Sequence, residues 1–374
     1  MFRFPLIRPD VPDPADWWGF VQEAHAGARF SNFGPLSRRL ERELALTWGF
    51  LDSTCVLAAS GTAAIAAPLL AFGVTGRVLV PAFTFPATLA AVRMAHLEPV
   101  VIDVAEEDWC VSATTLDAAL ARTGASAAVV VSPFGFRCDF TAHVATARRH
   151  GAVLVIDSAA CLGVERIHYE AAPHVAEAYS LHATKPFAIG EGGAVFAPRE
   201  LEPALRRALN FGLPDWHVPP GWGLNGKLSE THAAIGLAAA RRFPARLRLR
   251  REFVARCIEL AGRHRELRFC GRVTESSWQI FPLLFPSPSS SERFIQACHA
   301  LGLETRRYYA PSLSALPGVE HLGPCPIAES LAARMVCTPV YADYDTACLG
   351  EFLAAFSAAL TTALPSSCTE PSPA

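Results

Sequence analysis

A chain of 374 residues is too long for one ordinary hydrophobic core, so its length predicts two domains. Hydrophobic residues make up 51% of the chain and charged residues 18%, which predicts a folded protein with a large interior. The formal net charge of -2 gives no basic excess, so nucleic acid is not an expected partner.

The 11 cysteines are spread along the chain without a CxxC or CxxxC pair. This spacing argues against a disulfide framework and against a zinc or other metal site, and it favours a reducing compartment. No apolar run approaches the length of a membrane span, and the N-terminus lacks the apolar core of a signal peptide. We therefore expect a soluble, cytoplasmic protein without a membrane partner.

The first predicted elements are a helix, a strand and a second helix. A turn at residues 31–35 begins a helix with an apolar face at four-residue spacing, made by Leu36, Leu40, Leu44 and Trp48. A strand from Val56 to Ala59 then leads through Ser60-Gly61-Thr62 into an apolar helix that ends near residue 72. Such a turn can bind phosphate, because free N–H groups and the helix dipole favour an anion. An ordinary N-cap is the simpler interpretation of these residues taken alone.

Strands and helices alternate over the next 140 residues. The expected strands cover residues 77–81, 99–104, 127–132, 152–156 and 194–197, and the expected helices begin near residue 82 and cover 113–121, 141–150 and 201–209. Apolar strands without alternation, separated by helices, are typical of a parallel sheet covered on both faces. Ligands of such sheets bind at the carboxyl ends of the strands. Thr62, Phe85, Asp157 and Lys185 each follow a predicted strand, so we expect these four groups at one sheet edge.

Lys185 lies among small, apolar and hydroxyl residues in Ser180–Gly193. Lysine is usually kept at the protein surface, and a surface loop is the simplest interpretation of an arbitrary lysine. In a small-residue pocket, however, desolvation lowers the pKa of the amine and makes it a usable nucleophile. That chemistry suits a Schiff base with a carbonyl cofactor.

Asp157 follows directly on an apolar run, so its carboxylate is expected to be partly buried and to need a partner. A pyridinium N–H would be one such partner, with a charge-assisted hydrogen bond of roughly 1.5–3 kcal/mol. The alternative is a helix N-cap. A pocket lysine 28 residues later favours the cofactor interpretation.

The last third of the chain predicts a smaller α+β domain. An arginine-rich helix follows residues 225–232 and runs to about Cys257, and Pro244 should bend or break it. We place a boundary there: residues 1–243 form an N-terminal segment and large domain, 244–364 a small domain, and 365–374 a disordered tail. In the small domain we expect strands at 277–285 and 305–309, a Pro/Ser loop at 287–291, and helices at 293–301 and 349–360.

The chain resembles the DegT/DnrJ/EryC1/StrS family of pyridoxal-phosphate-dependent nucleotide-sugar aminotransferases. The resemblance runs from Asn32-Phe33-Gly34-Pro35 to Thr338-Pro339-Val340-Tyr341. Its strongest pieces are Ser60-Gly61-Thr62-Ala63-Ala64, Pro81-Ala82-Phe83-Thr84-Phe85, Asp157-Ser158-Ala159, Ser180-Leu181-His182-Ala183-Thr184-Lys185 and Gly190-Glu191-Gly192-Gly193. The family implies an α/β architecture of fold type I, with a large, mostly parallel, seven-stranded-type sheet and a smaller C-terminal α+β domain.

The resemblance also implies roles for individual residues. Lys185 matches the lysine that forms the Schiff base with pyridoxal 5'-phosphate, and Asp157 matches the partner of the pyridine nitrogen. Phe85 matches the aromatic residue stacked on the cofactor ring. The phosphate cradle corresponds to Thr62, Ala63 and Ser180. Asn225 matches an asparagine that reaches the phosphate of the neighbouring subunit's cofactor, which implies a homodimer with shared active sites.

Four positions depart from the family pattern. Ala160 stands where a glutamine or another polar residue touches the phenolic oxygen of the cofactor, and Leu162 and Phe211 replace frequent histidines. Asn225-Gly226-Lys227 replaces Asn-Tyr-Arg and so loses an aromatic ring and a planar cation. Because several of these positions lie near the substrate mouth in the family, the resemblance leaves the sugar open.

The family's activity is the transfer of an amino group, with L-glutamate as the expected donor, to a keto-sugar nucleotide in deoxyamino-sugar biosynthesis. Lys185 would then move a proton as general base and acid. A sugar dehydratase of the same fold is one alternative, but relatives of that kind carry histidine in place of Lys185. The other is a cofactor-binding regulatory protein with weak catalysis, which the substitutions at Ala160, Leu162 and Gly226 keep open.

Overall fold

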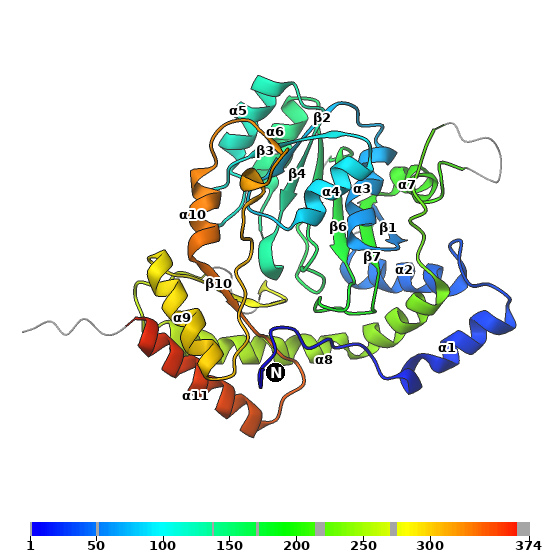
Figure 1. Ribbon diagram of the computed structural model, residues 1–374. Helices are drawn as coiled ribbons and strands as arrows, with labels where there is room; N and C mark the ends of the chain where they lie inside the picture. Colours follow the sequence, from blue (N-terminus) through cyan, green and yellow to red (C-terminus); the bar gives the residue numbers. More distant parts are fainter. Residues whose placement is uncertain are drawn as a thin grey trace, which may run out of the picture.

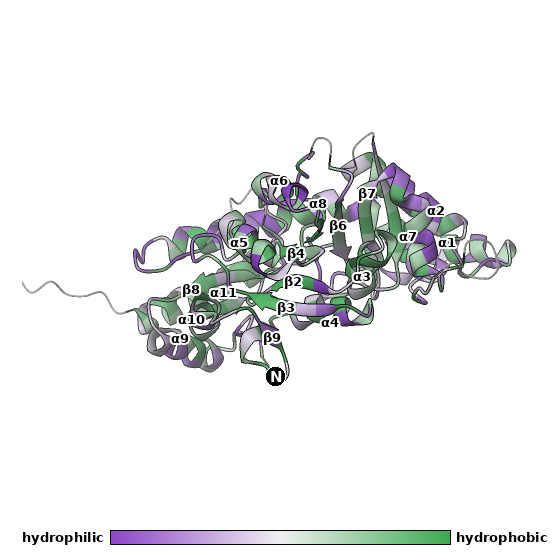
Figure 2. Ribbon diagram, turned by 90° about the horizontal axis from the view of Figure 1, so that it is seen from above, coloured by the Kyte–Doolittle hydropathy of each residue, from purple (hydrophilic) through white to green (hydrophobic). Residues whose placement is uncertain are grey.

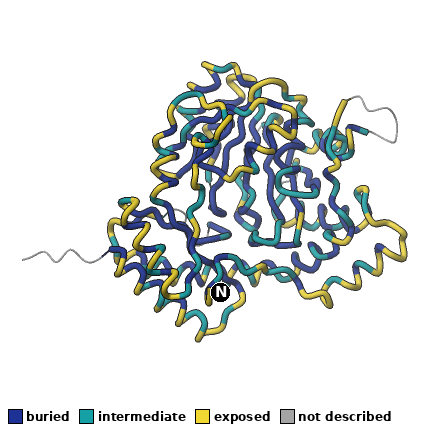
Figure 3. Tube along the Cα trace, in the orientation of Figure 1, coloured by how far each residue is buried: buried dark blue, intermediate teal, exposed yellow. Residues whose placement is uncertain are grey.

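An eight-stranded sheet lies at the centre of the protein, in the order β1-β7-β6-β5-β4-β2-β3-β9 (Figure 1). The computed structural model describes residues 2–49, 52–136, 138–169, 172–213, 221–269 and 275–364. The central strands are short runs of small and β-branched residues that are buried almost throughout, as strands covered on both faces must be (Figure 3). The strands are β1 (Ser53–Ala58), β2 (Arg77–Pro81), β3 (Glu98–Ile102), β4 (Ala127–Val131), β5 (Val153–Asp157), β6 (Val175–Ser180), β7 (Gly193–Pro198) and β9 (Glu320–His321).

The sheet is parallel except at β7. The neighbours from β6 through β5, β4, β2 and β3 to β9 pair in parallel, whereas β7 pairs antiparallel with both β6 and β1. The predicted architecture, a large and mostly parallel sheet, is therefore confirmed, and the two-residue β9 extends it at one edge. Because β1 runs in the same direction as β6, the carboxyl ends of β1, β5 and β6 share one edge of the sheet.

Helices cover both faces of this sheet, with α3, α4 and α7 on one face and α5 and α6 on the other (Figures 1 and 2). The green strands in Figure 2 mark the hydrophobic layer between them. The helices up to this point are α1 (Pro14–Ala26), α2 (Pro35–Trp48), α3 (Gly61–Ala71), α4 (Pro86–Met94), α5 (Ala113–Thr123), α6 (Thr141–Arg149) and α7 (Glu202–Leu209). Short 3-10 turns lie at Pro133–Gly135, Arg199–Leu201 and Leu313–Ala315.

The apolar face predicted for α2 is confirmed, because Leu36, Leu40 and Leu44 are all buried. Helix α1 was not predicted, although its start carries recognisable signals. The Asp13 side chain accepts a hydrogen bond from the N–H of Ala15, and Pro14 occupies the first helical position.

Helix α8 (Glu230–Ala261) is one continuous helix of 32 residues beneath the sheet (Figure 1). Pro244 was expected to bend or break this helix; the break is wrong, because the helix continues through Pro244. Proline in a helix interior costs about 3 kcal/mol, but both halves of α8 are anchored by buried side chains, including Phe243 before the proline and Leu247 and Phe253 after it. The domain boundary proposed at this residue therefore falls within a helix.

The C-terminal part packs two strands and three helices against the second half of α8. Its elements are β8 (Phe281–Leu284), α9 (Pro288–Ala300), α10 (Pro326–Arg334), β10 (Met335–Thr338) and α11 (Thr346–Ala363), with β8 and β10 antiparallel. The Pro/Ser loop expected at 287–291 is wrong, because Ser287 caps α9 in a capping box with Ser290. The strand expected at 305–309 reduces to one bridge between Arg306 and Cys337. The tail at 365–374 lies outside the described residues.

The N-terminal segment lies against the C-terminal part. Phe4 pairs with Leu303, and its ring meets Phe352 of α11 edge to face at 5.5 Å. Among the described residues α11 is the one helix long and apolar enough to cross a membrane, which corrects the expectation that no run approaches that length. Phe352 and Phe356 of this helix are fully buried in the protein core, so the signal is weak.

Candidate active site

The predicted site residues meet at the carboxyl edge of the sheet. Asp157 is the last residue of β5 and pairs with Ala178 of β6, and Ser180 is the last residue of β6. Ser180 and Ala58 both lie opposite Gly193, the first residue of β7. The strand ends therefore place Asp157, Ser180 and the start of α3 next to one another, as the topology predicted.

Lys185 lies in the loop that joins β6 to β7, and main-chain hydrogen bonds fix this loop. The N–H of Leu181 donates to the carbonyl of Gly192 at 2.8 Å, and the N–H of Ala183 donates to that of Gly190 at 2.7 Å. The N–H of Lys185 donates to the carbonyl of His182 in a tight turn. The base of the loop is therefore closed, and the position of the Lys185 backbone is set by the fold.

The Lys185 amine donates a hydrogen bond from Nζ to Oε1 of Gln279 at 3.0 Å. Burial lowers the pKa of this amine, and the nearby Asp157 carboxylate opposes the shift. The chain contains only two lysines, Lys185 and Lys227, against 31 arginines. Since arginine does not lose its proton in proteins, Lys185 is the amine at this edge that can act as a nucleophile.

Asp157 is buried, and its carboxylate has two hydrogen-bond donors. Oδ2 accepts from Oγ1 of Thr88 at 2.8 Å, and Oδ1 accepts from the N–H of Ala159 at 3.1 Å. Burial raises the pKa of Asp157, and the two donors and the Lys185 charge counteract it. No helix begins at Asp157, since residues 158–169 are turns and irregular chain, so the N-cap alternative does not apply.

The N-terminus of α3 forms the small-residue turn predicted for an anion. Ser60 is the N-cap, and its Oγ accepts from the N–H of Ala63 at 3.2 Å. A Cβ on Gly61 would lie 2.7 Å from Cβ of Ser180, so only glycine allows the helix to approach β6 this closely. Thr62 follows in the first turn and is half-buried. The N-cap interpretation is therefore confirmed, and the phosphate site at this helix end stays a prediction.

Phe85 ends the loop after β2 and is the N-cap residue of α4. It is 54% exposed, whereas Phe83, two residues earlier, is fully buried. An exposed ring next to buried neighbours at a sheet edge is free to stack on a planar ligand. The position agrees with the role that the resemblance implies.

Asn225 is an exposed residue in a partly buried stretch that follows α7 and contacts the chain just before α3. Oδ1 of Asn225 accepts from the amine of Lys227 at 2.9 Å, and the carbonyl of Gly226 accepts from the N–H of Ala59 at 2.6 Å. Lys227 also lies 4.2 Å over the ring of Phe211, which is exposed and has a φ of +59°. Phe211 and Lys227 thus form an aromatic and cationic contact at the surface, whereas Gly226 between Asn225 and Lys227 is buried.

The other two departures lie in the interior. Ala160 is buried, and its carbonyl accepts a hydrogen bond from the hydroxyl of Ser277. Leu162 is buried in the apolar cluster that includes Phe243 and Leu247 of α8. Leu162 therefore acts as a core residue, while Ala160 brings no polar side chain to the site.

Two residues that the sequence did not single out complete the site. Thr88 supplies a hydroxyl to Asp157, and Gln279 supplies an amide oxygen to Lys185. Thr88 could have been found, because it lies on the first turn of the helix that follows Phe85. Gln279 had one signal, a lone amide within the apolar run from Trp278 to Phe285.

The described residues fit one kind of ligand. A lysine with a lowered pKa suits a carbonyl carbon, and a buried carboxylate suits a protonated ring nitrogen. An exposed phenyl ring suits a flat aromatic face, and the N-terminus of α3 suits a phosphate. Pyridoxal 5'-phosphate carries these four groups, so the residues present fit this cofactor. Among the described residues, no group of three His, Cys, Asp or Glu could hold a metal ion.

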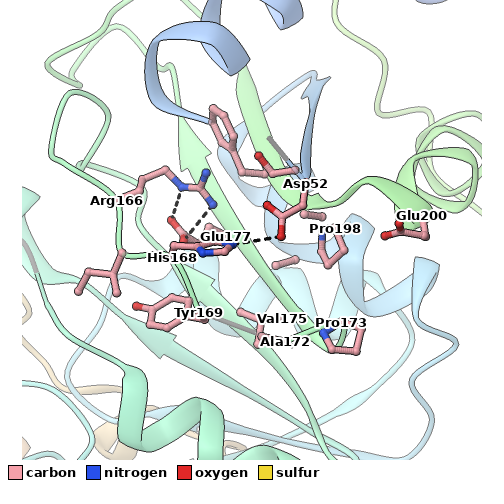
Figure 4. A pocket seen from close by; sticks show the side chains of 15 residues that line it. Asp52, Arg166, His168, Tyr169, Ala172, Pro173, Val175, Glu177, Pro198 and Glu200 are labelled. Carbon is pink, nitrogen blue, oxygen red and sulfur yellow. Dashed lines mark hydrogen bonds and ion pairs between the residues drawn. The ribbon is translucent and has the colours of Figure 1, made fainter. Parts of the chain in front are cut away.

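A separate cavity of about 240 Å³ lies at the opposite ends of β1, β6 and β7 (Figure 4). An ion pair forms one wall: the Arg166 guanidinium donates to both carboxylate oxygens of Glu177 at 3.0 and 3.1 Å, and both side chains are largely buried. His168 and Asp52 meet across the mouth at 3.1 Å. The strands separate this cavity from Lys185, so it is not part of the candidate active site.

Comparisons with known proteins agree with this geometry. The model of the DegT/DnrJ/EryC1/StrS aminotransferase family matches residues 17–356. Protein MT3510 from Mycobacterium tuberculosis (strain CDC 1551 / Oshkosh) is 32% identical over 323 residues, which cover 83% of this chain and 77% of that protein. The dTDP-4-amino-4,6-dideoxy-D-glucose transaminase from Shigella dysenteriae is 25% identical over 353 residues, with coverages of 91% and 95%.

A solved structure with a similar fold is that of DesI, determined in the presence of its TDP-sugar product. It superposes with a TM-score of 0.84 at 28% identity, and the match covers 96% of this chain and 95% of DesI. The similarity therefore extends over both the sheet and the C-terminal part.

Proposed function

The chain belongs to the DegT/DnrJ/EryC1/StrS aminotransferase family and is a pyridoxal-phosphate-dependent aminotransferase, and we propose on this premise that it aminates a keto-sugar nucleotide with L-glutamate as the donor. The sugar-nucleotide part of the proposal is supported by the transaminase from Shigella dysenteriae and by DesI, whose names or descriptions refer to dTDP- or TDP-sugars. The proposed product is a deoxyamino-sugar nucleotide.

One observation carries the assignment of the catalytic residues. Lys185, with a lowered pKa, and Asp157, a buried carboxylate, lie close enough at one sheet edge for their charges to interact. A lysine and an aspartate in this relation are what catalysis with a pyridine aldehyde requires. Thr62, Ala63, Ser180 and Phe85 are the proposed contacts to the phosphate and the ring.

The protein residues have separate tasks in this reaction. When bound, the cofactor supplies an aldehyde that accepts the amino group and a ring that accepts electrons. Lys185 Nζ would remove a proton from the substrate carbon and return it to the carbon on the other side of the transferred nitrogen, as general base and then general acid. Asp157 holds a proton on the ring nitrogen through a charge-assisted hydrogen bond. Thr88 and the N–H of Ala159 keep the Asp157 carboxylate oriented and ionised.

We propose a homodimer with shared active sites. The support is the exposed surface around Asn225, where Phe211 is 46% exposed and Trp222 is 88% exposed. Large exposed aromatic side chains next to one another mark an interaction surface. Asn225 is the residue on this surface proposed to reach the partner's phosphate site.

Two further expectations stay part of the proposal. We propose that the enzyme acts in the cytoplasm, since the spacing of its cysteines favours a reducing compartment. We also propose that the segments before and after residue 244 form a large and a small domain, joined through α8.

The test of the catalytic assignment is Lys185→Ala, with Arg248→Ala, an exposed position on α8, as the control. Each enzyme is loaded with cofactor and incubated with glutamate and a panel of keto-sugar nucleotides, and the products are identified by mass. Loss of a positioned acid–base group predicts at least about a 100-fold lower rate for Lys185→Ala. Multiple turnovers by Lys185→Ala at the wild-type rate would contradict the assignment, and amination of none of the sugars by the wild type would contradict the proposed substrate class.

A further inference from the structure

The contact between Lys185 and Gln279 joins two distant parts of the chain. Gln279 lies 94 residues after Lys185, in the segment that leads into β8 of the C-terminal part. Its side-chain oxygen meets the one atom of Lys185 that takes part in the chemistry, Nζ, at 3.0 Å. Both side chains are half-buried. This is a contact to the reacting atom and not a distant structural one.

The backbone around Gln279 is fixed from two sides. On the sheet side, the N–H of Gln279 donates to the carbonyl of Phe134 at 3.2 Å, and the N–H of Ser277 donates to that of Gly135 at 2.9 Å. A Cβ on Gly135, which has a φ of +95°, would lie 2.6 Å from Oγ of Ser277. The segment that carries Gln279 is therefore packed directly on the loop after β4.

On the other side, Arg250 of α8 holds the same segment. Its buried guanidinium donates from Nε and Nη2 to the carbonyl of Trp278 at 2.8 and 2.6 Å, and from Nη2 to the carbonyl of Gln279 at 2.8 Å. Hydrogen bonds from a charged donor are roughly twice as strong as neutral ones. These hydrogen bonds fix the backbone of Gln279, so its side-chain amide is held next to Lys185 and its oxygen is available to the Lys185 amine.

An amide oxygen differs from a carboxylate at this position in its charge. Both accept a hydrogen bond from a neutral amine and from an ammonium, but the amide adds no negative charge that favours the ammonium. A carboxylate 3.0 Å from Nζ would favour the ammonium and raise the pKa of Lys185. Two other groups act on the pKa of the Lys185 amine, the Asp157 carboxylate and the Cys161 thiol, and both raise it against the larger effect of burial.

We infer that Gln279 is a positioning residue that receives the free amine of Lys185 whenever the amine is not bonded to the cofactor. This inference rests on the proposed role of Lys185. During each half-reaction Lys185 must leave the cofactor and then act on the substrate carbon. Gln279 holds the released amine in one place and adds no charge that would keep it protonated, so that it can accept a proton and give it back.

The test measures the Lys185 amine in the cofactor-free protein, because this state exposes the contact without any turnover. The protein is labelled with trace acetic anhydride over a range of pH, and the labelled peptides are quantified by mass. The chain has only one other lysine, Lys227, which serves as an internal reference in every sample. The variants are Gln279→Glu, Gln279→Leu and Gln279→Asn, and the matched control is Gln296→Glu, an exposed glutamine on α9.

For Gln279→Glu we expect the labelling midpoint of Lys185 to move up by about one to three pH units, as for an amine next to a new opposite charge. For Gln279→Leu we expect it to move down, because the ammonium loses an acceptor. Gln279→Asn, which is one methylene shorter, should behave like Gln279→Leu. Lys227 should not move in any variant, and Gln296→Glu should leave both lysines unchanged.

In the loaded enzyme, Gln279→Leu should lower kcat by about 10-fold with little change in KM, as expected when one hydrogen bond to an acid–base group is lost. Equal labelling midpoints for Lys185 in wild type, Gln279→Glu and Gln279→Leu would overturn the inference. The proposed function fails separately: if Lys185→Ala keeps its turnover, the catalytic role of the lysine is wrong even where Gln279→Glu shifts the amine.

Discussion

Thr88→Val tests whether the hydroxyl of Thr88 keeps Asp157 ionised. Thr88 is fully buried, and its Oγ1 donates to Oδ2 of Asp157 at 2.8 Å. Valine has nearly the same shape, so the substitution removes the donor and leaves the packing in place. A hydrogen bond to a charged group contributes about 1.5–3 kcal/mol. In the variant the ionised form of Asp157 should lose this amount of free energy relative to the protonated form.

The expected loss depends on pH in a definite direction. Because burial already raises the pKa of Asp157, the folded protein holds this proton more tightly than the unfolded chain does. Ionisation of Asp157 therefore lowers the free energy of unfolding as the pH rises from the ordinary pKa of aspartate to the raised pKa in the folded protein. Without Thr88 the pKa rises further, so the variant loses about 1.5–3 kcal/mol near neutral pH and less as the pH falls toward the ordinary value of aspartate.

The assay is urea unfolding of the cofactor-free protein at several pH values, together with the pH profile of kcat/KM in the loaded enzyme. The acid limb of that profile should move to higher pH by about one to two units, at 1.36 kcal/mol per unit. Thr88→Ser keeps the hydroxyl and should behave like wild type. Thr84→Val removes only the neighbour 3.0 Å from Oγ1 of Thr88 and should change the acid limb little. A stability loss that is equal at all pH values would show a packing defect and refute the reasoning.

Two further substitutions address the phosphate site and the cavity on the far side of the sheet. Gly61→Ala would place a Cβ 2.7 Å from that of Ser180, so we expect at least about 10-fold weaker cofactor binding by spectroscopic titration; Gly350→Ala, which meets nothing within 4 Å, should bind normally. Glu177→Leu leaves the buried Arg166 guanidinium without its carboxylate, so urea unfolding should show a loss of about 3–5 kcal/mol, whereas a loss below 1 kcal/mol would mean that solvent reaches the pair.

The features that the sequence predicted best are those that depend on residues close together in the chain. Apolar runs marked β2 at its observed bounds, and the four-residue spacing of leucines marked the buried face of α2. The same local logic placed Asp157 and Lys185 after strand ends, because a parallel sheet brings all its carboxyl ends to one edge. The sheet topology alone was therefore enough to predict that these residues converge, and no side-chain contact had to be known.

The errors have physical causes of two kinds. Ser287 and Pro288 look like a loop by composition but start α9, since serine caps a helix and proline fits its first turn. Pro244 looks like a helix breaker, yet tertiary packing on both sides outweighs its local cost. In the first case the helix-start signal is present in the local sequence, and in the second the deciding interactions lie outside it.

Gln279 belongs to a third class, which no local pattern could assign. Its relation to Lys185 depends on Arg250 of α8, on the carbonyls after β4 and on the close approach that Gly135 permits. None of these residues stands out in the sequence, but together they place the side-chain amide of Gln279 next to the amine of Lys185. Such residues can be recognised only when the C-terminal part is seen packed on the sheet.

The use of lysine in this chain links its composition to its chemistry. Among the described residues most ion pairs are made by arginine, as in the pairs of Arg166 with Glu177 and Arg206 with Glu41, and a few by histidine. An arginine keeps its proton under all these conditions and cannot form a Schiff base, whereas a desolvated lysine can lose its proton. Burial lowers the pKa of both lysines, and only Lys185 lies beside a buried carboxylate. The chain therefore presents a single amine at the sheet edge that can serve as both nucleophile and proton carrier, and the fold supplies Gln279 to hold it between these two tasks.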